Sequence, residues 1–579
     1  MTRLPLVYIL CLALALPLAY GSLKAQSTVW VKSLGGTADD VGGDIVVDAS
    51  GNIYVTGSFT GTVDFDPGFG ISNLTSVGGI DFFIQKLDNS GDLIWVKSVG
   101  GPRDDQSYSI AVDLNGDVFT TGYFQDTVDF DPGTGSTILT TDGYPPTQQG
   151  YQDIFILKLD ASGNFLWAIG MGDNYTAETG RSIAVDQSGN VYTAGQFYSP
   201  FDFDPGPGID DLNLIGSKQT TFLQKLDGSG NFLWAASVYG EGFSIEVDQY
   251  ENVYSTGYFS DTIDFDPGPD TFNLTTSYWT DKDVFIQKLN ASGNLVWAKS
   301  ISGIGSYQYG YSIAVDLDGN VLTTGVFEDT ADFDPDTSVF NLVSGGFGDA
   351  FIQKLDSNGS FVWAKSMGGV EHARGHSIDV DGSGNVYTIG DFWVTGDFDP
   401  GVGSFILNSE GGSDVFIQKL DPSGNFLWAQ SMGGNSDDLA KSIAVNAVGE
   451  SYTIGQYAET AYFYLGSGPI SLVSAGQYDI FIQKLGTILS INETEAAMGF
   501  KVFPNPSNGQ FTIELNSTSQ EQIELKIVNI LGQEVFAESV KLVPGIYRKE
   551  IDIQAHTSGI YLLQLMTNQG VKSVKMVLE

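Results

Sequence analysis

Short segments in which apolar and polar residues alternate recur along most of this 579-residue chain. In one copy, Ser-Ile-Ala-Val-Asp at 312–316 and Phe-Ile-Gln-Lys-Leu at 351–355 alternate with the period of a β-strand. Two further segments in each copy, of the forms VYTTGxF and FLWAKS, are rich in aromatic and β-branched residues, which suit strands. The tryptophan of FLWAKS recurs about every 66 residues and marks seven copies: Trp30, Trp95, Trp167, Trp234, Trp297, Trp363 and Trp428.

Turn sequences separate the four strand segments of each copy. Asp-x-x-Gly-Asn follows the first segment and Asp-x-Ser-Gly-Asn follows the third, and Gly and Asn tolerate the positive φ of tight turns. No segment has an apolar stripe of period 3.6, so the fold class is all-β. Seven copies of a four-stranded unit predict a seven-bladed β-propeller over residues 26–486.

The ends of the repeated region predict how the ring closes. The first strand, at 28–33, has no preceding FIQKL segment, and the last copy ends at 481–485 without a following FLWAKS segment. We therefore expect the N-terminal strand to complete the seventh blade as its outermost strand; the alternative is an open solenoid. In this topology the Gly-Asn turns share one face, and the longer, more variable connections lie on the other face, where function usually resides.

Both ends of the chain differ from the repeats. Residues 1–25 have a basic start, an apolar run and small residues before a cleavage site, which is typical of a secretory signal peptide. The single cysteine, Cys11, lies inside this segment, so the mature chain has no thiol, and we expect no integral membrane segment in it. A polar linker at 487–499 precedes a separate small β domain at 500–579.

Two resemblances follow from these phrases. The SIAVDxxGNVYTTG and FIQKLDxSGNFLW phrases resemble the bacterial β-propeller repeat family of secreted proteins. The PNPSNG, NxLGQ and SGIYLL phrases and a lysine-bearing last strand resemble the C-terminal sorting domain of the type IX secretion system of Bacteroidetes-type bacteria. This second resemblance implies a β-sandwich, the type IX machinery as a partner, and delivery to the outer cell surface or the medium. An ordinary adhesive β-sandwich is the alternative.

Acidic residues dominate the charge of the chain. There are 70 Asp and Glu against 26 Lys and Arg, which gives a formal net charge of −44. Such a surface repels phosphate backbones and anionic membranes, so we expect no nucleic-acid partner. It suits divalent cations or cationic partners, or it is a solvated acidic exterior.

The most regular polar motif is Asp-Phe-Asp-Pro-Gly. Its two carboxylates stand at i and i+2 of an extended segment and face the same side, where they could supply oxygens to Ca²⁺, with loop carbonyls completing the shell. The alternative is structural, with Asp bonding its own turn and Phe buried. The seventh copy has lost the motif, at 462–465. The candidate calcium ligands are Asp64, Asp66, Asp129, Asp131, Asp202, Asp204, Asp264, Asp266, Asp332, Asp334, Asp397 and Asp399.

Catalytic motifs are not visible in the sequence. There is no G-x-S-x-G elbow, no P-loop and no cysteine nucleophile in the mature chain, so we predict that the protein is not an enzyme. His372 and His376 flank Arg374 in a loop predicted to enter the sixth blade, and a histidine pair four residues apart suits zinc only on a helix. Trp279 and Trp393 fall outside the repeat phase and either pack or stack on sugar rings.

The sequence therefore predicts a secreted or cell-surface binding scaffold, with a glycan or protein ligand on the long-loop face. The main alternative is an extracellular polysaccharide hydrolase or lyase on a propeller scaffold, and a structural surface-layer role is a third reading. An enzyme is expected to break the sevenfold symmetry with one charged cluster unique to one or two blades.

Overall fold

A computed structural model of the chain describes residues 27–578, apart from the segments given at the end of this paragraph. It divides into two compact units, Met1–Ile488 and Leu489–Glu579. The predicted signal peptide at 1–25 and the predicted linker at 487–499 lie outside the described residues. The segments left out between 27 and 578 are 69, 142–150, 174–175, 213–219, 277–280, 304–306, 466–467, 487–499, 504–506, 508, 518–520, 530–533, 544, 555–558 and 568–569.

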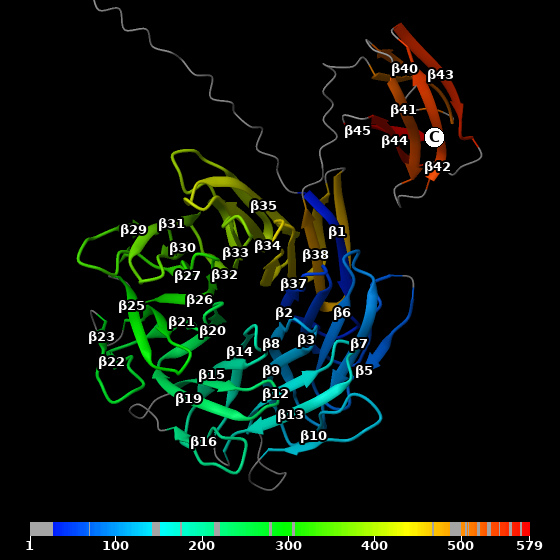
Figure 1. Cartoon of the computed structure of the whole chain (residues 1–579). Helices are drawn as coiled ribbons and strands as arrows, with labels where there is room; N and C mark the ends of the chain where they lie inside the picture. The colour runs from blue at the N-terminus through cyan, green and yellow to red at the C-terminus, as the bar shows by residue number, and fades with distance from the viewer. Residues whose placement is uncertain are drawn as a thin grey trace, which may run out of the picture. The chain divides into compact units, whose positions relative to one another are not determined.

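The first unit consists of seven repeats of four antiparallel strands, which Figure 1 shows around a common centre. We number the repeats 1 to 7 and call their first strand, nearest the centre, the inner strand. The inner strands are β2 (Val41–Val47), β8 (Gln106–Val112), β14 (Thr179–Val185), β20 (Glu241–Val247), β26 (Gln308–Val315), β32 (Ala373–Val380) and β36 (Leu439–Val445). The second strands are β3 (Ile53–Phe59), β9 (Val118–Phe124), β15 (Val191–Phe197), β21 (Val253–Phe259), β27 (Val321–Phe327), β33 (Val386–Asp397) and β37 (Ser451–Leu465).

The outer half of each repeat follows the same order. The third strands are β6 (Asp81–Leu87), β12 (Asp153–Leu159), β18 (Thr220–Leu226), β24 (Asp283–Leu289), β30 (Asp349–Leu355), β34 (Ile406–Leu420) and β38 (Gly468–Gly486). The outermost strands of repeats 1 to 6 are β7 (Leu93–Val99), β13 (Phe165–Met171), β19 (Phe232–Tyr239), β25 (Leu295–Gly303), β31 (Phe361–Gly369) and β35 (Phe426–Gly434). Short hairpins follow the second strands: β4 (Thr62–Asp64) with β5 (Asn73–Thr75), β10 (Thr127–Asp129) with β11 (Ile138–Thr140), β16 (Phe201–Asp202) with β17 (Asp211–Leu212), β22 (Thr262–Asp264) with β23 (Asn273–Thr275), and β28 (Thr330–Asp332) with β29 (Asn341–Val343).

The N-terminal strand pairs with the last repeat. β1 (Ser27–Leu34) runs antiparallel to β38, with Val31 opposite Gln483 and Ser33 opposite Phe481. It therefore occupies the outermost position of repeat 7, which has no FLWAKS segment of its own. Each inner strand also contacts the inner strands on both sides, and β36 contacts β2.

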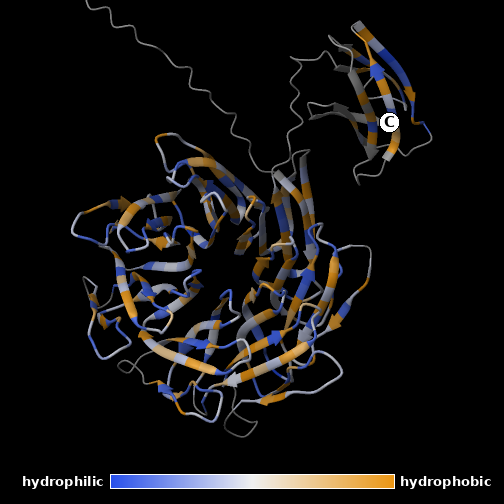
Figure 2. Cartoon of the chain, in the orientation of Figure 1, coloured by the Kyte–Doolittle hydropathy of each residue, from blue (hydrophilic) through white to orange (hydrophobic). Residues whose placement is uncertain are grey.

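Apolar cores fill the spaces between neighbouring repeats. The second and third strands are almost entirely buried, and each of seven apolar clusters draws its side chains from two adjacent repeats. One cluster joins Phe59 and Phe83 of repeat 1 to Ile454 and Ile482 of repeat 7. Figure 2 shows hydrophobic and hydrophilic residues alternating along many of these strands, as the sequence pattern predicts.

A ring of hydrogen bonds links the inner strands. The serine of the Ser-Ile motif accepts the backbone N–H of the isoleucine in the next repeat at 3.1–3.3 Å. Asp44 takes the place of this serine in repeat 1, where it accepts the Ile110 N–H at 3.0 Å and the Ser109 hydroxyl at 2.9 Å. It also accepts the hydroxyl of Ser442, from repeat 7, at 2.6 Å. The serines that act as acceptors are Ser109, Ser182, Ser244, Ser312 and Ser377.

Replacing Asp44 by alanine is expected to lower the free energy of unfolding by about 2–4 kcal/mol, because donors from two other repeats lose a buried acceptor. Asp44→Ser restores the residue of the other repeats and keeps an acceptor for the Ile110 N–H, so its loss should be smaller. Denaturant unfolding of the full chain measures both values. An equal loss for the two variants would contradict this role of Asp44.

Buried carboxyl groups make a second contact between repeats. Between repeats 6 and 7, Asp414 and Asp438 are 3% and 1% exposed. A methyl group placed on Gly433 would lie 2.5 Å from Asp414 Oδ1 and 2.9 Å from Asp438 Oδ2, so the two carboxyl groups face the same glycine. The equivalent acidic positions at three other contacts are Asp81 with Asp105, Asp153 with Glu178, and Asp479 with Asp40.

Among the described residues, no cation forms an ion pair with Asp414 or Asp438. Asp438 accepts the N–H groups of Gly434 and Ala458, whereas Asp414 Oδ1 is buried without a hydrogen-bond partner. Burial raises the pKa of Asp414 to about 7 and that of Asp438 to about 8. Because both pKa values lie well above the usual value of Asp, the folded pair holds protons that an unfolded chain loses well below neutral pH.

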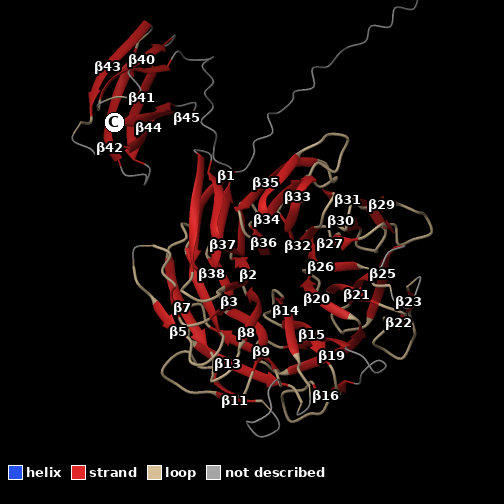
Figure 3. Cartoon of the chain, turned by 180° about the vertical axis from the view of Figure 1, so that it is seen from behind, coloured by secondary structure: helices blue, strands red, loops and turns tan. Residues whose placement is uncertain are grey.

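The second compact unit is also all-β. One sheet has the order β39-β40-β43 and the other β42-β41-β44-β45, and the two sheets share an apolar core that includes Phe511, Leu525 and Leu563. Within the described ranges of the whole chain the regular elements are strands (Figure 3), and no helix has the length and apolar character that a membrane crossing needs. The strands of this unit are β39 (Phe500–Phe503), β40 (Gln510–Ser517), β41 (Glu521–Asn529), β42 (Glu534–Leu542), β43 (Gly545–Asp552), β44 (Gly559–Thr567) and β45 (Gly570–Leu578).

Candidate functional site

The Asp-Phe-Asp-Pro-Gly carboxylates accept hydrogen bonds from their own loops. In repeat 1, Asp64 accepts the N–H groups of Asp66 and Ser72 at 3.1 and 2.8 Å, and Asp66 accepts the N–H of Gly68 at 2.8 Å. The intervening Phe65 is buried. The same bonds recur in the other five copies, and in repeat 7 Phe463 keeps the buried aromatic position.

Calcium binding by these twelve carboxylates stays a prediction. Each repeat holds its own pair, so the structure does not gather pairs from different repeats into one site. Across the described part of the chain there is no group of three or more Asp, Glu, His or Cys side chains in an arrangement that would hold a metal ion. A calcium ion at one of the pairs would need its remaining ligands from backbone oxygens.

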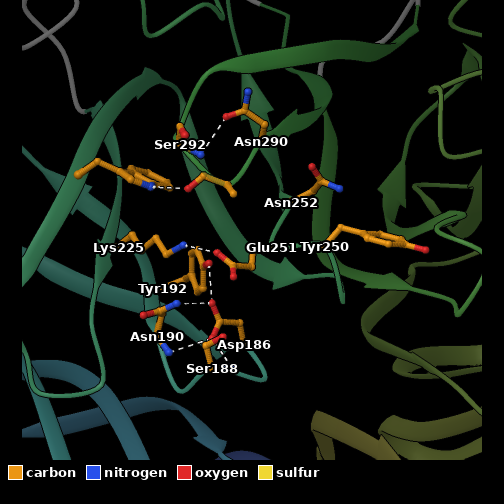
Figure 4. A network of polar contacts seen from close by, with 12 residues as sticks. Asp186, Ser188, Asn190, Tyr192, Lys225, Tyr250, Glu251, Asn252, Asn290 and Ser292 are labelled. Carbon is orange, nitrogen blue, oxygen red and sulfur yellow. Dashed lines mark hydrogen bonds and ion pairs between the residues drawn. The ribbon is translucent and has the colours of Figure 1, made fainter.

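The Gly-Asn turns and the repeat lysines form a second regular network, shown for one region in Figure 4. Asp186 accepts the N–H groups of Ser188 and Asn190 at 2.8 and 2.9 Å and the Tyr192 hydroxyl at 2.9 Å. Lys225 lies 4.9 Å from the centre of the Tyr192 ring and pairs with Glu251 of the next repeat at 2.8 Å. Asp186, Asn190, Tyr192 and Lys225 have counterparts in most repeats, so they hold turns and repeats together, whereas Glu251 stands where the other repeats have glycine.

One set of positions that differ from repeat to repeat lies on the inner strands. Each inner strand has a β-bulge at the residue before the ring serine or Asp44. Because a bulge residue lies outside the regular pairing, its side chain can be re-aimed. The seven bulge residues, in order, are Gly43, Tyr108, Arg181, Phe243, Tyr311, His376 and Lys441.

The bulge side chains contact one another across repeat boundaries. The Arg181 guanidinium lies 5.0 Å from the centre of the Tyr108 ring. Further round the ring, the Phe243 and Tyr311 ring centres are 5.6 Å apart, and those of Tyr311 and His376 are 5.7 Å apart. Three aromatic side chains, two basic side chains (Arg181 and Lys441) and one histidine therefore occupy bulge positions, whereas the neighbouring inner-strand positions repeat.

A row of tyrosines extends from this ring. Tyr307, Tyr309 and Tyr311 have parallel rings at successive distances of 6.1 and 5.9 Å, and Tyr307 is 44% exposed. Lys282 donates to the Tyr309 hydroxyl at 2.9 Å and lies 4.3 Å from the centre of the Tyr258 ring. Burial raises the pKa of Tyr309 and of Tyr311 to about 12, so both hydroxyls stay protonated.

Arg374 and the histidines of the sixth repeat belong to the same region. Arg374 lies 5.2 Å from the centre of the Trp393 ring, and His376 forms a hydrogen bond with Asp391. The prediction that Arg374 and His376 lie in a loop was wrong, because β32 begins at Ala373 and pairs with β33. His372 precedes the strand, with its ring 5.9 Å from that of Trp393. Trp279 lies outside the described residues.

We call these side chains together the inner cluster. Most lysines of the repeats belong to the FIQKL or WAKS segments. Among the described Lys, Arg and His side chains of the first unit that lie outside those segments, all but Arg103 belong to this region. The inner cluster consists of Tyr108, Arg181, Phe243, Tyr258, Lys282, Tyr307, Tyr309, Tyr311, His372, Arg374, His376, Asp391, Trp393 and Lys441.

Sequence reasoning found the sixth-repeat residues and Trp393 but missed most of the inner cluster. Arg181, Phe243 and Lys441 occupy one repeat column, immediately before Ser-Ile, in which no residue type predominates. That variability inside an otherwise regular phrase was the available signal. The tyrosines at 307–311 give a second signal, a local run of aromatic residues outside the repeat pattern.

Comparisons with known proteins agree with both resemblances. Residues 94–123 match the model of the β-propeller repeat, and residues 501–579 match the secretion system C-terminal sorting domain. The chain thus carries a β-propeller repeat and ends in a type IX sorting domain, which supports secretion or cell-surface delivery.

Similar proteins cover the chain unevenly. An uncharacterized WD repeat-containing protein L264 of Acanthamoeba polyphaga mimivirus is 24% identical over 79% of this chain and 38% of its own length. The regulatory protein FlaEY of Caulobacter vibrioides is 26% identical over 24% of this chain and 14% of its own length. The chain therefore spans less than half of each relative. A solved structure of a protein of unknown function from Bacteroides caccae covers 49% of this chain and 89% of its own, at 11% identity and a TM-score of 0.21.

Proposed function

We propose that this chain is a secreted or cell-surface binding protein that recognises a glycan with the inner cluster of a closed seven-bladed β-propeller. The pairing of β1 with β38 and the contact of β36 with β2 support closure. The shared core of two sheets supports a β-sandwich in the C-terminal unit. The predicted signal peptide and the sorting domain fit export in two steps, through the inner membrane and then by the type IX machinery.

The observation that carries the binding proposal is the break in symmetry at the inner cluster. Scaffold positions recur around the ring, whereas a ligand site needs residues that differ between repeats. Parallel tyrosine rings with an exposed member offer apolar faces for sugar rings, and protonated hydroxyls and cationic groups supply polar contacts. A small number of precisely placed polar groups on an aromatic surface is typical of small-ligand sites.

A polysaccharide lyase or hydrolase is the second candidate. The hydrogen-bonded pair of His376 and Asp391 lies beside Tyr311, and a histidine oriented by a carboxylate can act as a general base. This pair exists in the sixth repeat alone among those described, as expected of a catalytic group.

Replacing Tyr307 by alanine is expected to weaken glycan binding about tenfold, since one aromatic platform contributes about 1–2 kcal/mol. A glycan array with the full secreted chain identifies the ligand, and calorimetry then compares the variants. Tyr464→Ala is the matched control, because Tyr464 is 46% exposed but belongs to β37, outside the inner cluster. Equal affinities of both variants and the parent chain would exclude this site, and release of shortened glycan products would favour the lyase or hydrolase.

A further inference from the structure

Two buried donors in the third repeat have no hydrogen-bond partner within the described structure. They are Arg181 Nε, on β14, and Gln196 Nε2, on the adjacent strand β15. The Gln196 side chain is 3% exposed. A buried donor without an acceptor costs about 1–3 kcal/mol, so two such donors on neighbouring strands favour the binding of an acceptor here.

The repeat geometry places these two donors together. In three other repeats, the bulge residue contacts the residue at the Gln196 position: Tyr108 with Tyr123, Phe243 with Tyr258, and His376 with Asp391. Arg181 and Gln196 occupy the same two positions in the third repeat, one beside the other across the β14–β15 pairing. We therefore infer that the two unpartnered donors lie close together at the centre of the ring.

Aromatic and charged neighbours complete the surroundings of Arg181. The Tyr108 ring lies under its guanidinium at 5.0 Å, and burial raises the pKa of Tyr108, whose hydroxyl donates to Gln106 Oε1 at 3.0 Å. Arg181 acts on the pKa of Tyr198 together with the carboxyl groups of Glu241 and Glu178. Burial raises the pKa of Glu178 to about 7, and its oxygens accept hydrogen bonds from Thr176 and from the Asp173 N–H. Arg181 forms no ion pair with a described carboxylate.

A second cation of the bulge ring is also without an ion partner. Lys441, in the seventh repeat, has no ion pair or hydrogen bond among the described side chains, and burial lowers its pKa. The carboxyl group of Asp391 acts to raise the pKa of Lys441, but Asp391 already forms a hydrogen bond with His376. Two basic side chains without ion pairs among the described residues therefore lie on inner strands of a chain with a net charge of −44.

We propose that the inner cluster selects acidic saccharides, with the carboxylate of a uronic acid unit bound by Arg181 and Gln196 and a neighbouring carboxylate bound by Lys441. The planar guanidinium suits bidentate recognition of a carboxylate, and the amide of Gln196 supplies a further donor. The tyrosines hold the sugar rings, while the acidic exterior repels polyanions elsewhere, so binding is confined to this centre. The proposal rests on the proposed function, because it assigns a chemical class to the same glycan.

Matched ligands separate charge from sugar shape. The full secreted chain is titrated with tetrasaccharides of galacturonate, glucuronate, mannuronate and guluronate, and with the methyl ester of each, which keeps the sugar but removes the charge. At least one acid is expected to bind ten times or more tightly than its ester. Its affinity should fall as sodium chloride rises from 50 to 500 mM, because salt screens the ion pairs.

Substitutions then show which basic side chains recognise the carboxylates of the ligand. Arg181→Gln is expected to reduce the ratio of acid to ester affinity tenfold or more, Lys441→Gln to reduce it less, and Arg181→Lys to retain part of it. Arg103→Gln and Lys365→Gln remove the same charges outside the inner cluster, on a loop and on the outermost strand β31, and should leave the ratio unchanged. Melting temperatures close to that of the parent chain establish that the variants are folded.

The outcomes separate the two proposals. If esters bind as tightly as acids and Arg181→Gln changes nothing, the selection of acidic sugars is wrong while glycan binding through Tyr307 stands. If neither acids nor esters bind and the glycan array is also empty, the glycan-binding function itself is wrong.

Discussion

A chain that ends at Gly499 is expected to accumulate in the periplasm, with almost none at the cell surface or in the medium. Residues 501–579 match the sorting domain, and they form a compact unit of their own. Removing them leaves the strands and apolar clusters of the first unit untouched. The truncated chain should therefore fold but lack the segment that the exporter recognises. Cell fractionation and immunoblotting in a bacterium with a type IX system measure its distribution.

Two controls show whether retention reflects lost sorting. The full chain with Asp44→Ala has a weakened ring but an intact sorting domain and should still leave the periplasm. The full chain in a strain without a working exporter should be retained like the truncated one. Surface delivery of the chain that ends at Gly499 would contradict the sorting role.

The first unit is expected to lose stability as the pH rises from about 4 to about 8. Asp414 and Asp438, between repeats 6 and 7, have pKa values raised by burial to about 7 and about 8, whereas an unfolded Asp titrates near 3.8. Between these values the folded chain holds protons that the unfolded chain has lost, so its stability is greatest below the unfolded pKa and falls through the folded pKa. One raised pKa of this size corresponds to a few kcal/mol.

Asp414→Asn tests this directly, because it replaces one of the two titrating carboxyl groups by a neutral amide of similar shape. The variant should be more stable than the parent chain above pH 8, with a flatter dependence on pH. Asp349→Asn is the matched control: Asp349 holds the equivalent position but faces Ala373, and burial raises its pKa only to about 6. Denaturant unfolding from pH 4 to 9 measures all three. A parent chain that gains stability over this range, or equal shifts for both variants, would contradict the protonation of this pair.

Much of the architecture could be predicted from the sequence because the same pattern of apolar and polar residues occurs in each repeat. The period-two segments give the strands, and the missing FLWAKS segment of the last copy predicts the place of β1 beside β38, at 481–485. The burial of the phenylalanine in the Asp-Phe-Asp-Pro-Gly motif also follows from the repeat, since Phe65 and its equivalents recur at one position.

The inner cluster could not be predicted in the same way. Arg181 and Gln196 are neighbours only because two strands pair around a bulge, and the contact between Tyr108 and Arg181 joins residues of different repeats. The sequence predicts a loop for Arg374 and His376 because the recognisable strand phrase starts at Ser377, whereas backbone pairing with β33 extends β32 back to Ala373. Local patterns do not report such tertiary contacts.

Because of the place of β1, the pairing of this strand and the presence of the sorting domain both depend on the C-terminal part of the chain. β1 is synthesised first, but its partner β38 begins only at Gly468, and the sorting domain comes after it. A polypeptide interrupted anywhere before Gly468 leaves β1 as an unpaired edge and carries no sorting domain. We therefore expect incomplete products of synthesis to stay off the cell surface, because they lack the sorting domain.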